Sequence, residues 1–405
     1  MAVYTHFQDY PPNNVWADII GDAYMAVAPV LVIFDNTDGT RTRAEGNFNV
    51  LANGTILGGE INTLKRVSAD GTVYESITGL KLDANNFVTA TGAQKLALAF
   101  AGNDSLNGNA GADFLKGYGG ADVLAGGAGD DHYSVDDPAD VVLEEANHGT
   151  DKVFTALASY TLPENVEDLA FSGAISHTGI GNALANEFFG STGKDTFYGL
   201  DGNDRFHSLG GGDLCHGGKG GDTYYLEIGD SAIELPDEGF DQIAGEFDSY
   251  TLPANVEGLG DMGNGTGVIT GNELDNLITV YSQPGRTVLG LGGNDRLVNM
   301  MGKNTLDGGD GDDRLTATTG FATLIGGAGD DTFVIRSAKA VIMDFAAGEG
   351  TPDRVDLHDY KPGVYPDKGQ AFFTTLSDIL AHTTQNGADA VIDLGAGNTL
   401  TLKNV

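Results

Sequence analysis

Aspartates recur every nine residues in two runs of this chain and every eighteen residues in a third, where Asn304 stands between Asp295 and Asp313. Each stands two residues after a glycine and two residues before an apolar or aromatic side chain. Carboxylates at a fixed interval can supply oxygen ligands to a cation if the fold brings successive ones together. One such motif is weak evidence in a chain with 61 glycines, but three runs in phase are not explained by composition. The aspartates are Asp104, Asp113, Asp122 and Asp131, then Asp195, Asp204, Asp213 and Asp222, then Asp295, Asp313 and Asp331.

The glycines of the runs predict where the chain turns. Glycine accepts positive φ and close backbone approach, so each glycine favours a sharp turn just before its aspartate. The carbonyl groups of such turns can face a cation together with the carboxylates. We therefore include these glycines in the predicted sites: Gly102, Gly111, Gly120, Gly129, Gly193, Gly202, Gly211, Gly220, Gly293, Gly311 and Gly329.

The element that must position these residues is a short strand. The half of each repeat around the aspartate alternates with period two, which places the apolar residue on the inside. Two repeats then make one turn of a parallel roll, and residues eighteen apart stack. This predicts six aspartate pairs: Asp104 with Asp122, Asp113 with Asp131, Asp195 with Asp213, Asp204 with Asp222, Asp295 with Asp313, and Asp313 with Asp331.

The ligand set favours one kind of cation. Carboxylates and carbonyls without imidazole or thiolate suit calcium, a hard cation with six to eight oxygen ligands, better than zinc or copper. Asx turns would explain one aspartate, but not a ladder of like charges. We expect about six strong calcium sites, with weaker ones at the ends of the runs. The other row of the third run should fail, because Asn304 stacks over Ala322.

Several repeats match a known consensus almost letter for letter. GGAGDDHYS (126–134), GGDGDDRLT (308–316) and GGAGDDTFV (326–334) resemble the hemolysin-type calcium-binding nonapeptide of the RTX family, GGxGxDxUx. The resemblance implies a parallel β-roll, calcium as the cofactor, and export of an unfolded chain by type I secretion machinery. Since cytosolic calcium is scarce, we expect the repeats to fold only outside the cell.

A longer period overlies the short one. ASYTLPENVEDLAFSG, from Ala158, returns as DSYTLPANVEGLGDMG, from Asp248, at an offset of ninety residues. Related RTX chains share such intervening segments. We interpret them as further rungs of one solenoid and not as linkers.

Composition limits the partners. Acidic residues outnumber basic ones 58 to 21, which gives a net charge of -37. This argues against binding to nucleic acid or to anionic membranes. The single cysteine, Cys215, excludes an internal disulfide, and it falls at an inward position of a repeat. No run of about eighteen apolar residues predicts a transmembrane segment, and the N-terminus has no signal-peptide pattern.

The first hundred residues lack the nonapeptide. NG and DG pairs between alternating segments predict a small antiparallel β domain or cap. Aromatic residues around Trp16 are either a small core or a glycan-binding surface. A cluster of positive residues could contact the acidic roll of a neighbouring copy or an anionic polysaccharide. The positive residues are Arg41, Arg43, Lys65 and Arg66.

The predicted fold class is all-β: an elongated parallel β-roll or β-solenoid with a small N-terminal β domain and a C-terminal cap. The domains are expected at 1–98 (N-terminal β domain or cap), 99–345 (calcium-binding roll) and 346–405 (cap or secretion-related segment). Residues 372–387 show the only helical periodicity, as a cap or as part of a secretion signal. Within the roll, the nonapeptide runs lie near 99–135, 182–225 and 290–334.

No catalytic motif accompanies the repeats. HExxH and GxSxG are absent, and the phosphate-loop glycine that STGKDT would need is Phe188. We expect a non-enzymatic, calcium-dependent, secreted protein of the bacterial surface or extracellular matrix, with self-association into a filament or layer as one outcome. The alternatives are an adhesin or lectin-like polysaccharide-binding module and an RTX-linked extracellular enzyme with an unrecognised site.

Overall fold

The computed structural model describes residues 103–108, 110–281, 285–346, 352–357, 376–395 and 397–405, together with the backbone of five strands nearer the N-terminus. The chain forms two compact units, 1–193 and 194–405. This division follows internal contacts and does not test the three domains predicted from the sequence. Each unit is described by itself.

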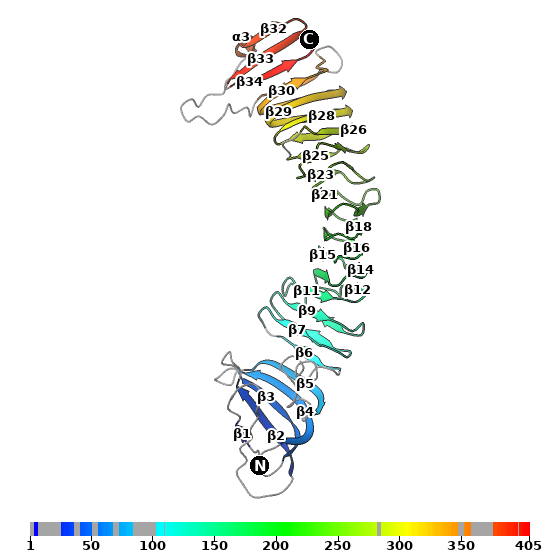
Figure 1. The fold of residues 1–405 in the computed structure, drawn as a ribbon, viewed down its shortest axis with the longest axis vertical. Coiled ribbons are helices and arrows are strands. Elements are labelled where there is room, and N and C mark those ends of the chain that lie inside the picture. Colours follow the sequence, from blue (N-terminus) through cyan, green and yellow to red (C-terminus); the bar gives the residue numbers. More distant parts are fainter. Residues whose placement is uncertain are drawn as a thin grey trace. The chain divides into compact units, whose positions relative to one another are not determined.

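The N-terminal strands form an antiparallel sheet (Figure 1). β2 to β5 pair in sequence order, as the NG and DG signals predict, whereas β1 pairs parallel with β2. β5 pairs antiparallel with β6 (Ser105–Asn107), the first strand of the roll. The bounds of these strands are β1 Tyr4–His6, β2 Ala26–Asp35, β3 Arg41–Val50, β4 Ile56–Val67 and β5 Val73–Asp83.

The rest of the first unit is a parallel roll with short strands on facing sides. Strands pair at an interval of eighteen residues within the nonapeptide run, as Leu106 with Leu124. The interval becomes twenty and then sixteen in the segment after the run, where Val153 pairs with Tyr133 and with Leu169. One side holds β6, β8 (Val123–Ala125) and β10 (Val141–Leu143), then β12 (Ser159–Thr161) and β14 (Thr178–Ile180). The other holds β7 (Phe114–Lys116), β9 (His132–Val135), β11 (Lys152–Thr155), β13 (Asp168–Phe171) and β15 (Glu187–Phe189).

The second unit continues the same construction. Its intervening segments also pair in parallel with the repeats before and after them, so they are rungs of the roll. β29 (Arg314–Ala328) bends at Gly320, whose φ is +86°, and contributes to both sides. The remaining strands are β16 (Thr196–Asp201), β17 (Arg205–His207), β18 (Leu214–Lys219), β19 (Thr223–Leu226), β20 (Ser231–Ile233), β21 (Gln242–Gly245), β22 (Tyr250–Thr251), β23 (Gly258–Asp261), β24 (Val268–Thr270), β25 (Leu277–Val280), β26 (Thr287–Gly292), β27 (Arg296–Asn299), β28 (Lys303–Asp310) and β30 (Thr332–Ile342).

The apolar position of the repeat forms the core of each roll. These side chains point inward because strand residues alternate between two faces. Stacking at eighteen residues is direct: the rings of Phe206 and Tyr224 lie 5.0 Å apart and 10° from parallel. Cys215 is buried in the facing column, where it pairs in register with Phe197. The buried column residues are Leu106, Leu115, Leu124 and Tyr133, then Phe197, Phe206, Cys215 and Tyr224, then Leu297, Leu306, Leu315, Leu324 and Phe333.

The C-terminal end closes the second roll with a small mixed sheet. β30 pairs parallel with β31 (Arg354–Asp356) and β34 (Asn398–Leu402), and β32 (Thr383–Asn386), β33 (Asp389–Gly395) and β34 pair antiparallel. The helix predicted over 372–387 extends too far toward the C-terminus: α3 (Leu376–Ala381) ends at Ala381, and 372–375 lie outside the described residues. Thr383–Asn386 forms β32 instead, because β-branched threonines favour a strand. The chain then turns at Gly387, whose φ of +66° suits glycine.

Across the part of the chain that the structure describes, no helix has the length and apolar character that a membrane crossing requires.

Candidate metal centres

The roll brings together all six aspartate pairs predicted from the sequence. In each pair the backbone N–H of the first aspartate donates a hydrogen bond to Oδ1 of the aspartate eighteen residues later. This arrangement repeats with nearly constant geometry in the three runs. The N to Oδ1 distances are 2.8 Å for Asp104 and Asp122, 2.7 Å for Asp113 and Asp131, 2.7 Å for Asp195 and Asp213, 2.7 Å for Asp204 and Asp222, 2.8 Å for Asp295 and Asp313, and 2.9 Å for Asp313 and Asp331.

The second carboxylate oxygen of most ladder aspartates has no hydrogen-bond partner. These side chains are at most 4% exposed, so water does not solvate them freely. A buried polar oxygen without a partner costs free energy, and a charged one costs more. The arrangement therefore fits a cation as the missing partner. The unpartnered atoms are Oδ2 of Asp104, Asp122, Asp131, Asp213, Asp222, Asp295, Asp313 and Asp331.

A glycine keeps space open in front of six of these oxygens, those of Asp122, Asp131, Asp222, Asp295, Asp313 and Asp331. A Cβ built on Gly308 would overlap Asp313 Oδ2, five residues later, and would lie 2.6 Å from the carbonyl oxygen of Gly326. Gly290 stands in the same relation to Asp295 and to the carbonyl of Gly308. Carboxylate and carbonyl oxygens thus converge on one small space, which is the hard-oxygen donor set that calcium prefers. Sequence reasoning missed these first glycines of the repeat, although the GG doublet was a signal.

The predicted glycines, two residues before each aspartate, form the turns. Positive φ is found at Gly120, Gly129, Gly202, Gly211, Gly220, Gly293, Gly311 and Gly329, between 100° and 141°. At Gly311 a Cβ would overlap the carbonyl oxygen of Gly293, so the turns of neighbouring rungs touch. Gly111 and Gly193 are not among the positive-φ residues. Gly102 lies outside the described residues.

The ladder continues beyond the nonapeptides, which sequence reasoning did not predict. Acidic residues of the intervening segments accept the same backbone hydrogen bond, at intervals of seventeen to twenty-two residues. Because these intervals vary, a search at fixed spacing does not find them. The added acceptors are Asp140 (2.9 Å, from Asp122), Asp151 (2.8 Å, from Asp131), Asp230 (2.9 Å, from Asp213), Asp241 (2.8 Å, from Asp222) and Asp353 (3.1 Å, from Asp331).

Burial makes these carboxylates reluctant to ionise. Burial, together with neighbouring carboxylates, raises the pKa of Asp104, Asp222 and Asp313 to about 7. The pKa of Asp213 and Asp331 rises to about 6 for the same reasons.

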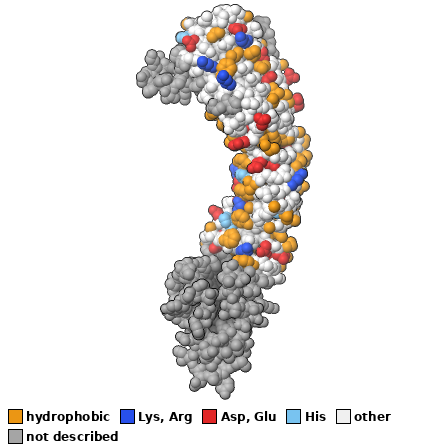
Figure 2. Space-filling model, viewed as in Figure 1, with side chains coloured by type: hydrophobic (Ala, Val, Ile, Leu, Met, Phe, Trp, Pro, Cys, Tyr) orange, Lys and Arg blue, Asp and Glu red, His pale blue; other side chains and the backbone are white. Residues whose placement is uncertain are grey.

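On the face drawn in Figure 2, the exposed acidic side chains are scattered among hydrophobic ones and form no single patch. The strongest crowding of negative charge is therefore along the buried ladders.

The row predicted to fail carries a guanidinium. Arg286 N donates to Asn304 Oδ1 at 2.9 Å, as an aspartate would, and Asn304 pairs in register with Ala322. The buried Arg286 side chain turns inward, where its Nε lies 3.0 Å from Oδ2 of the buried Asp261. Its terminal nitrogens donate to the carbonyls of Phe247 and Asp248, at 2.5 and 2.9 Å. In this row, therefore, the guanidinium of Arg286 supplies the positive charge.

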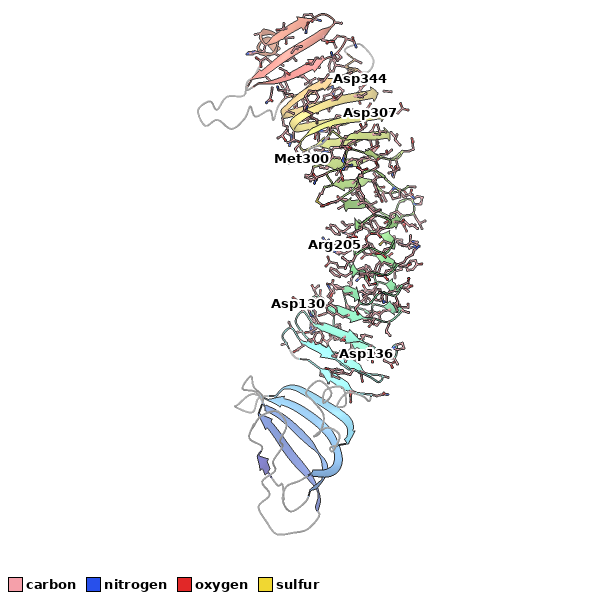
Figure 3. All side chains as sticks on the ribbon, in the orientation of Figure 1. Asp130, Asp136, Arg205, Met300, Asp307 and Asp344 are labelled. Atoms are coloured by element: carbon pink, nitrogen blue, oxygen red, sulfur yellow. The ribbon has the colours of Figure 1, made fainter. Side chains whose placement is uncertain are left out.

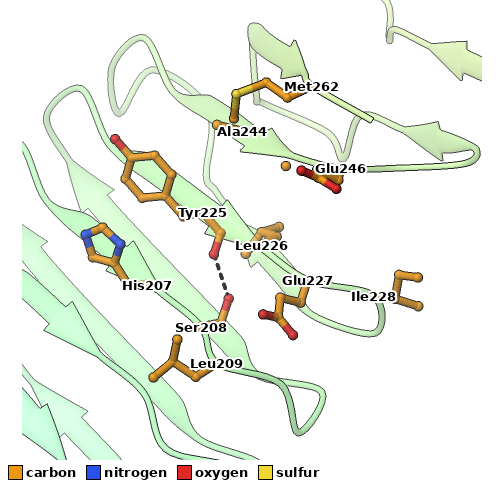
Figure 4. Close-up of a pocket in the computed structure, with 11 residues that line it drawn as sticks. His207, Ser208, Leu209, Tyr225, Leu226, Glu227, Ile228, Ala244, Glu246 and Met262 are labelled. Carbon is orange, nitrogen blue, oxygen red and sulfur yellow. Dashed lines mark hydrogen bonds between the residues drawn. The ribbon is translucent and has the colours of Figure 1, made fainter. Parts of the chain in front are cut away.

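An open pocket of about 530 Å³ lies in the second unit, beside the ends of β17, β19 and β21 (Figure 4). Two of its polar side chains contact neighbouring strands: Ser208 Oγ donates to the carbonyl of Tyr225 at 2.9 Å, and the His207 ring stacks on the Tyr225 ring at 4.6 Å. Leu209, Ile228 and Met262 make much of its rim apolar and exposed.

Fold and sites together define a parallel β-roll whose turns present stacked carboxylates to cations. The RTX calcium-binding nonapeptide repeat matches this chain in four copies, over residues 98–133, 180–215, 189–224 and 307–334. The chain therefore contains RTX calcium-binding nonapeptide repeats, in stretches that overlap all three predicted runs.

Other comparisons add little. A solved structure, the crystal structure of extracellular lipase LipA from Serratia marcescens, shares 16% sequence identity, with 63% of this chain and 43% of the lipase chain covered and a TM-score of 0.18. The match thus spans less than half of the length of the lipase, and a TM-score of 0.18 does not indicate a shared overall structure. No curated protein matches the sequence significantly.

Proposed function

We propose that the aspartate ladders bind calcium and that the chain is a non-enzymatic, secreted protein which folds when calcium fills them. The observation that carries this proposal is the row of buried Oδ2 atoms without a partner, six of which face a space kept open by glycine. The ligands would be the carboxylates of the six pairs and the carbonyls of the turn glycines. Calcium would supply the positive charge that the described ladders lack.

The magnitude of the effect is large enough to control folding. A site that binds with a dissociation constant of roughly 10⁻⁴ M contributes about 1.4 kcal/mol at millimolar calcium, or about 8 kcal/mol for six sites. The stability of a whole domain is about 5 to 15 kcal/mol. At submicromolar calcium the same contribution is close to zero. Folding would therefore be confined to calcium-rich surroundings, as the extracellular space is.

Circular dichroism of the full chain, with millimolar calcium and after removal of calcium, tests the proposal. We expect a strong β signal with calcium and its loss without, together with about six bound calcium ions by isothermal titration calorimetry. An unchanged β signal in the calcium-free protein, or binding of one ion or none, would contradict the proposal.

The place of action would be the bacterial surface or the extracellular matrix. RTX repeats are typical of secreted proteins, which supports an extracellular location and export by type I secretion machinery. Self-association into a filament or layer, and contact with an anionic polysaccharide, are the partner hypotheses. Light scattering and electron microscopy with and without calcium test assembly. A glycan array tests the lectin-like alternative, which depends on side chains in 1–98 that lie outside the described residues.

A specific contact bears on the enzyme alternative. Ser191 Oγ lies 3.2 Å from His177 Nδ1, a distance that suits a nucleophile and its base. Both residues are enclosed, however, with 5% and 1% of their surface exposed, and the His177 ring stacks on Phe171 at 4.6 Å. A substrate could not reach this serine in the folded roll, which supports a structural role for the pair.

A further inference from the structure

Two clusters of three carboxylates lie where a nonapeptide run meets the segment that follows it. The first consists of Asp131, Glu144 and Asp151, and the second of Asp222, Glu234 and Asp241. Within each cluster, one carboxylate oxygen per residue lies within 4.8 Å of those of the other two. The aspartates belong to the ladder, but Glu144 and Glu234 come from outside the nonapeptides and from outside the ladder.

The two clusters are built in the same way in the two units. Asp131 N donates to Asp151 Oδ1, and Asp222 N donates to Asp241 Oδ1, both at 2.8 Å. The hydroxyl of the buried Tyr133 donates to Glu144 Oε1, and the Tyr224 hydroxyl donates to Glu234 Oε1. An arrangement that recurs after ninety residues, with a tyrosine fixing the glutamate in both places, is not an accidental gathering of acidic groups.

Unpartnered oxygens point into both clusters. Asp222 Oδ2 and Glu234 Oε2 have no hydrogen-bond partner, and their residues are 1% and 5% exposed. Asp131 Oδ2 is likewise unpartnered in a fully buried side chain. A Cβ on Gly217 would overlap Asp222 Oδ2, the Tyr224 hydroxyl and Glu234 Oε1. Glycine therefore keeps a space open that three acidic and phenolic oxygens surround.

The charge in these spaces is not balanced by the protein. Burial, aided by the neighbouring aspartates, raises the pKa of Glu144 to about 7 and that of Glu234 to about 8. Within the described part of the chain, no lysine or arginine forms an ion pair with any of the six carboxylates. Three ionised carboxylates at this separation would repel one another strongly without a cation.

The third nonapeptide run provides a contrast inside the same molecule. Phe333 stands where the other runs have tyrosine, so no hydroxyl fixes an acidic partner. Asp344 follows Asp331 by thirteen residues, as Glu144 follows Asp131. Its shorter carboxylate accepts backbone hydrogen bonds from Gly326 at 3.0 Å and from Gly327 at 2.9 Å (Figure 3). Asp344 is thus held by the turn, and the described residues there form no third cluster.

We propose that each Asp–Glu–Asp cluster is a separate calcium site, tighter than the paired-aspartate sites, in which Glu144 or Glu234 adds a third carboxylate from outside the repeat. Affinity for calcium rises with the number of charged ligands and with the rigidity of the site, and the tyrosine supplies rigidity. The chain then has two calcium sites that fill first, one in each unit. This proposal rests on calcium binding by the ladders.

Calcium titration against a chelator of matched affinity tests the proposal. We expect Glu144→Gln and Glu234→Gln each to remove one of two high-affinity sites, with at least a roughly tenfold loss of affinity at that site. The matched controls are Glu145→Gln, one residue away and 83% exposed, and the exposed Glu227→Gln. Neither should alter the two high-affinity sites. High-affinity calcium binding that is the same in all four variants would overturn the proposal. As long as the wild-type chain binds calcium, that result would not contradict calcium binding by the ladders.

Terbium gives a second test that does not depend on how well the glutamine variants fold. Tb³⁺ is a hard cation that takes oxygen ligands, and its emission is sensitised by a nearby tyrosine. We expect the first two equivalents of Tb³⁺ to show tyrosine-sensitised emission, and Tyr224→Phe or Tyr133→Phe to remove about half of it while the calcium stoichiometry is kept. Early emission that is unchanged in both variants would place the first-filled sites elsewhere and contradict the proposal. A wild-type chain that binds no calcium would instead contradict the ladder function itself.

Discussion

A single methyl group is enough to test a calcium cradle at the residue scale. Gly308→Ala would place a Cβ on Asp313 Oδ2 and close to the Gly326 carbonyl. We expect the loss of one calcium ion by calorimetry and of at least about 1.4 kcal/mol of stability in calcium, by urea unfolding. Gly260→Ala is the matched control, because a Cβ there meets nothing within 4 Å. Equal calcium counts in the two variants would show that the cradle does not hold the ion.

The middle aspartate of a ladder should have opposite effects in the two calcium states. Asp313 accepts a hydrogen bond from Asp295 N and donates one to Asp331 Oδ1. Asp313→Asn should destabilise the calcium-bound roll by about 1 to 3 kcal/mol, because a ligand charge is lost. In the calcium-free protein it should stabilise, because repulsion with Asp295 and Asp331 is relieved. The exposed Asp310→Asn serves as control; urea unfolding with the same sign in both states would contradict the prediction.

The ladder aspartates could be predicted from the sequence because their spacing is regular and their chemistry is simple. The nonapeptide fixes a stacking interval of eighteen residues, and the structure brings each predicted pair together. Glu144 and Glu234 could not be predicted, since their distance along the chain from Asp131 and Asp222 differs by one residue. Only the packing of Tyr133 and Tyr224 shows which of many acidic residues turn inward.

At the scale of elements, the buried ion pair between β23 and the start of β26 should stabilise the roll. Arg286→Met would leave Asp261 buried and unpaired, and we expect the calcium-bound protein to lose about 3 to 5 kcal/mol of stability against urea. The double variant Arg286→Met, Asp261→Asn should recover part of the lost stability. As a control, Lys219→Met removes the ion pair with Asp201, whose two side chains are 74% and 63% exposed. It should lower the free energy of unfolding in urea by less than about 1 kcal/mol.

The strands were predictable where the repeat is regular and less so where tertiary packing decides. Alternation around each aspartate predicts the strands of the runs. The helix at 372–387 was predicted too long at its C-terminal end, because Thr383–Asn386 pairs with β33 and this pairing favours a strand. The inward guanidinium of Arg286 had no signal in the sequence, because a lone arginine in a loop-like segment is usually exposed.

At the scale of the whole molecule, protonation of the buried carboxylates at low pH should stabilise the calcium-free roll and so replace part of the effect of calcium. The unfolded carboxyl pKa is 3.8, and burial raises that of Asp104, Asp222 and Asp313 to about 7. The folded calcium-free chain therefore binds more protons than the unfolded chain between about pH 4 and 7, so stability falls as the pH rises through this window. Calcium-free protein should gain β signal and urea resistance on acidification from above pH 7 to about pH 5. No change, or a loss, would contradict this prediction.

Many ladder aspartates form hydrogen bonds with two neighbouring rungs at once. Asp313 shares one hydrogen bond with the rung before it and one with the rung after it, and the same holds along the other runs. An ion that orders one rung therefore prepares a ligand for the next, so occupancy of adjacent sites is thermodynamically linked. If the ladders bind calcium as proposed, we expect a threshold: the roll should fold over a narrow range of calcium concentration and not gradually.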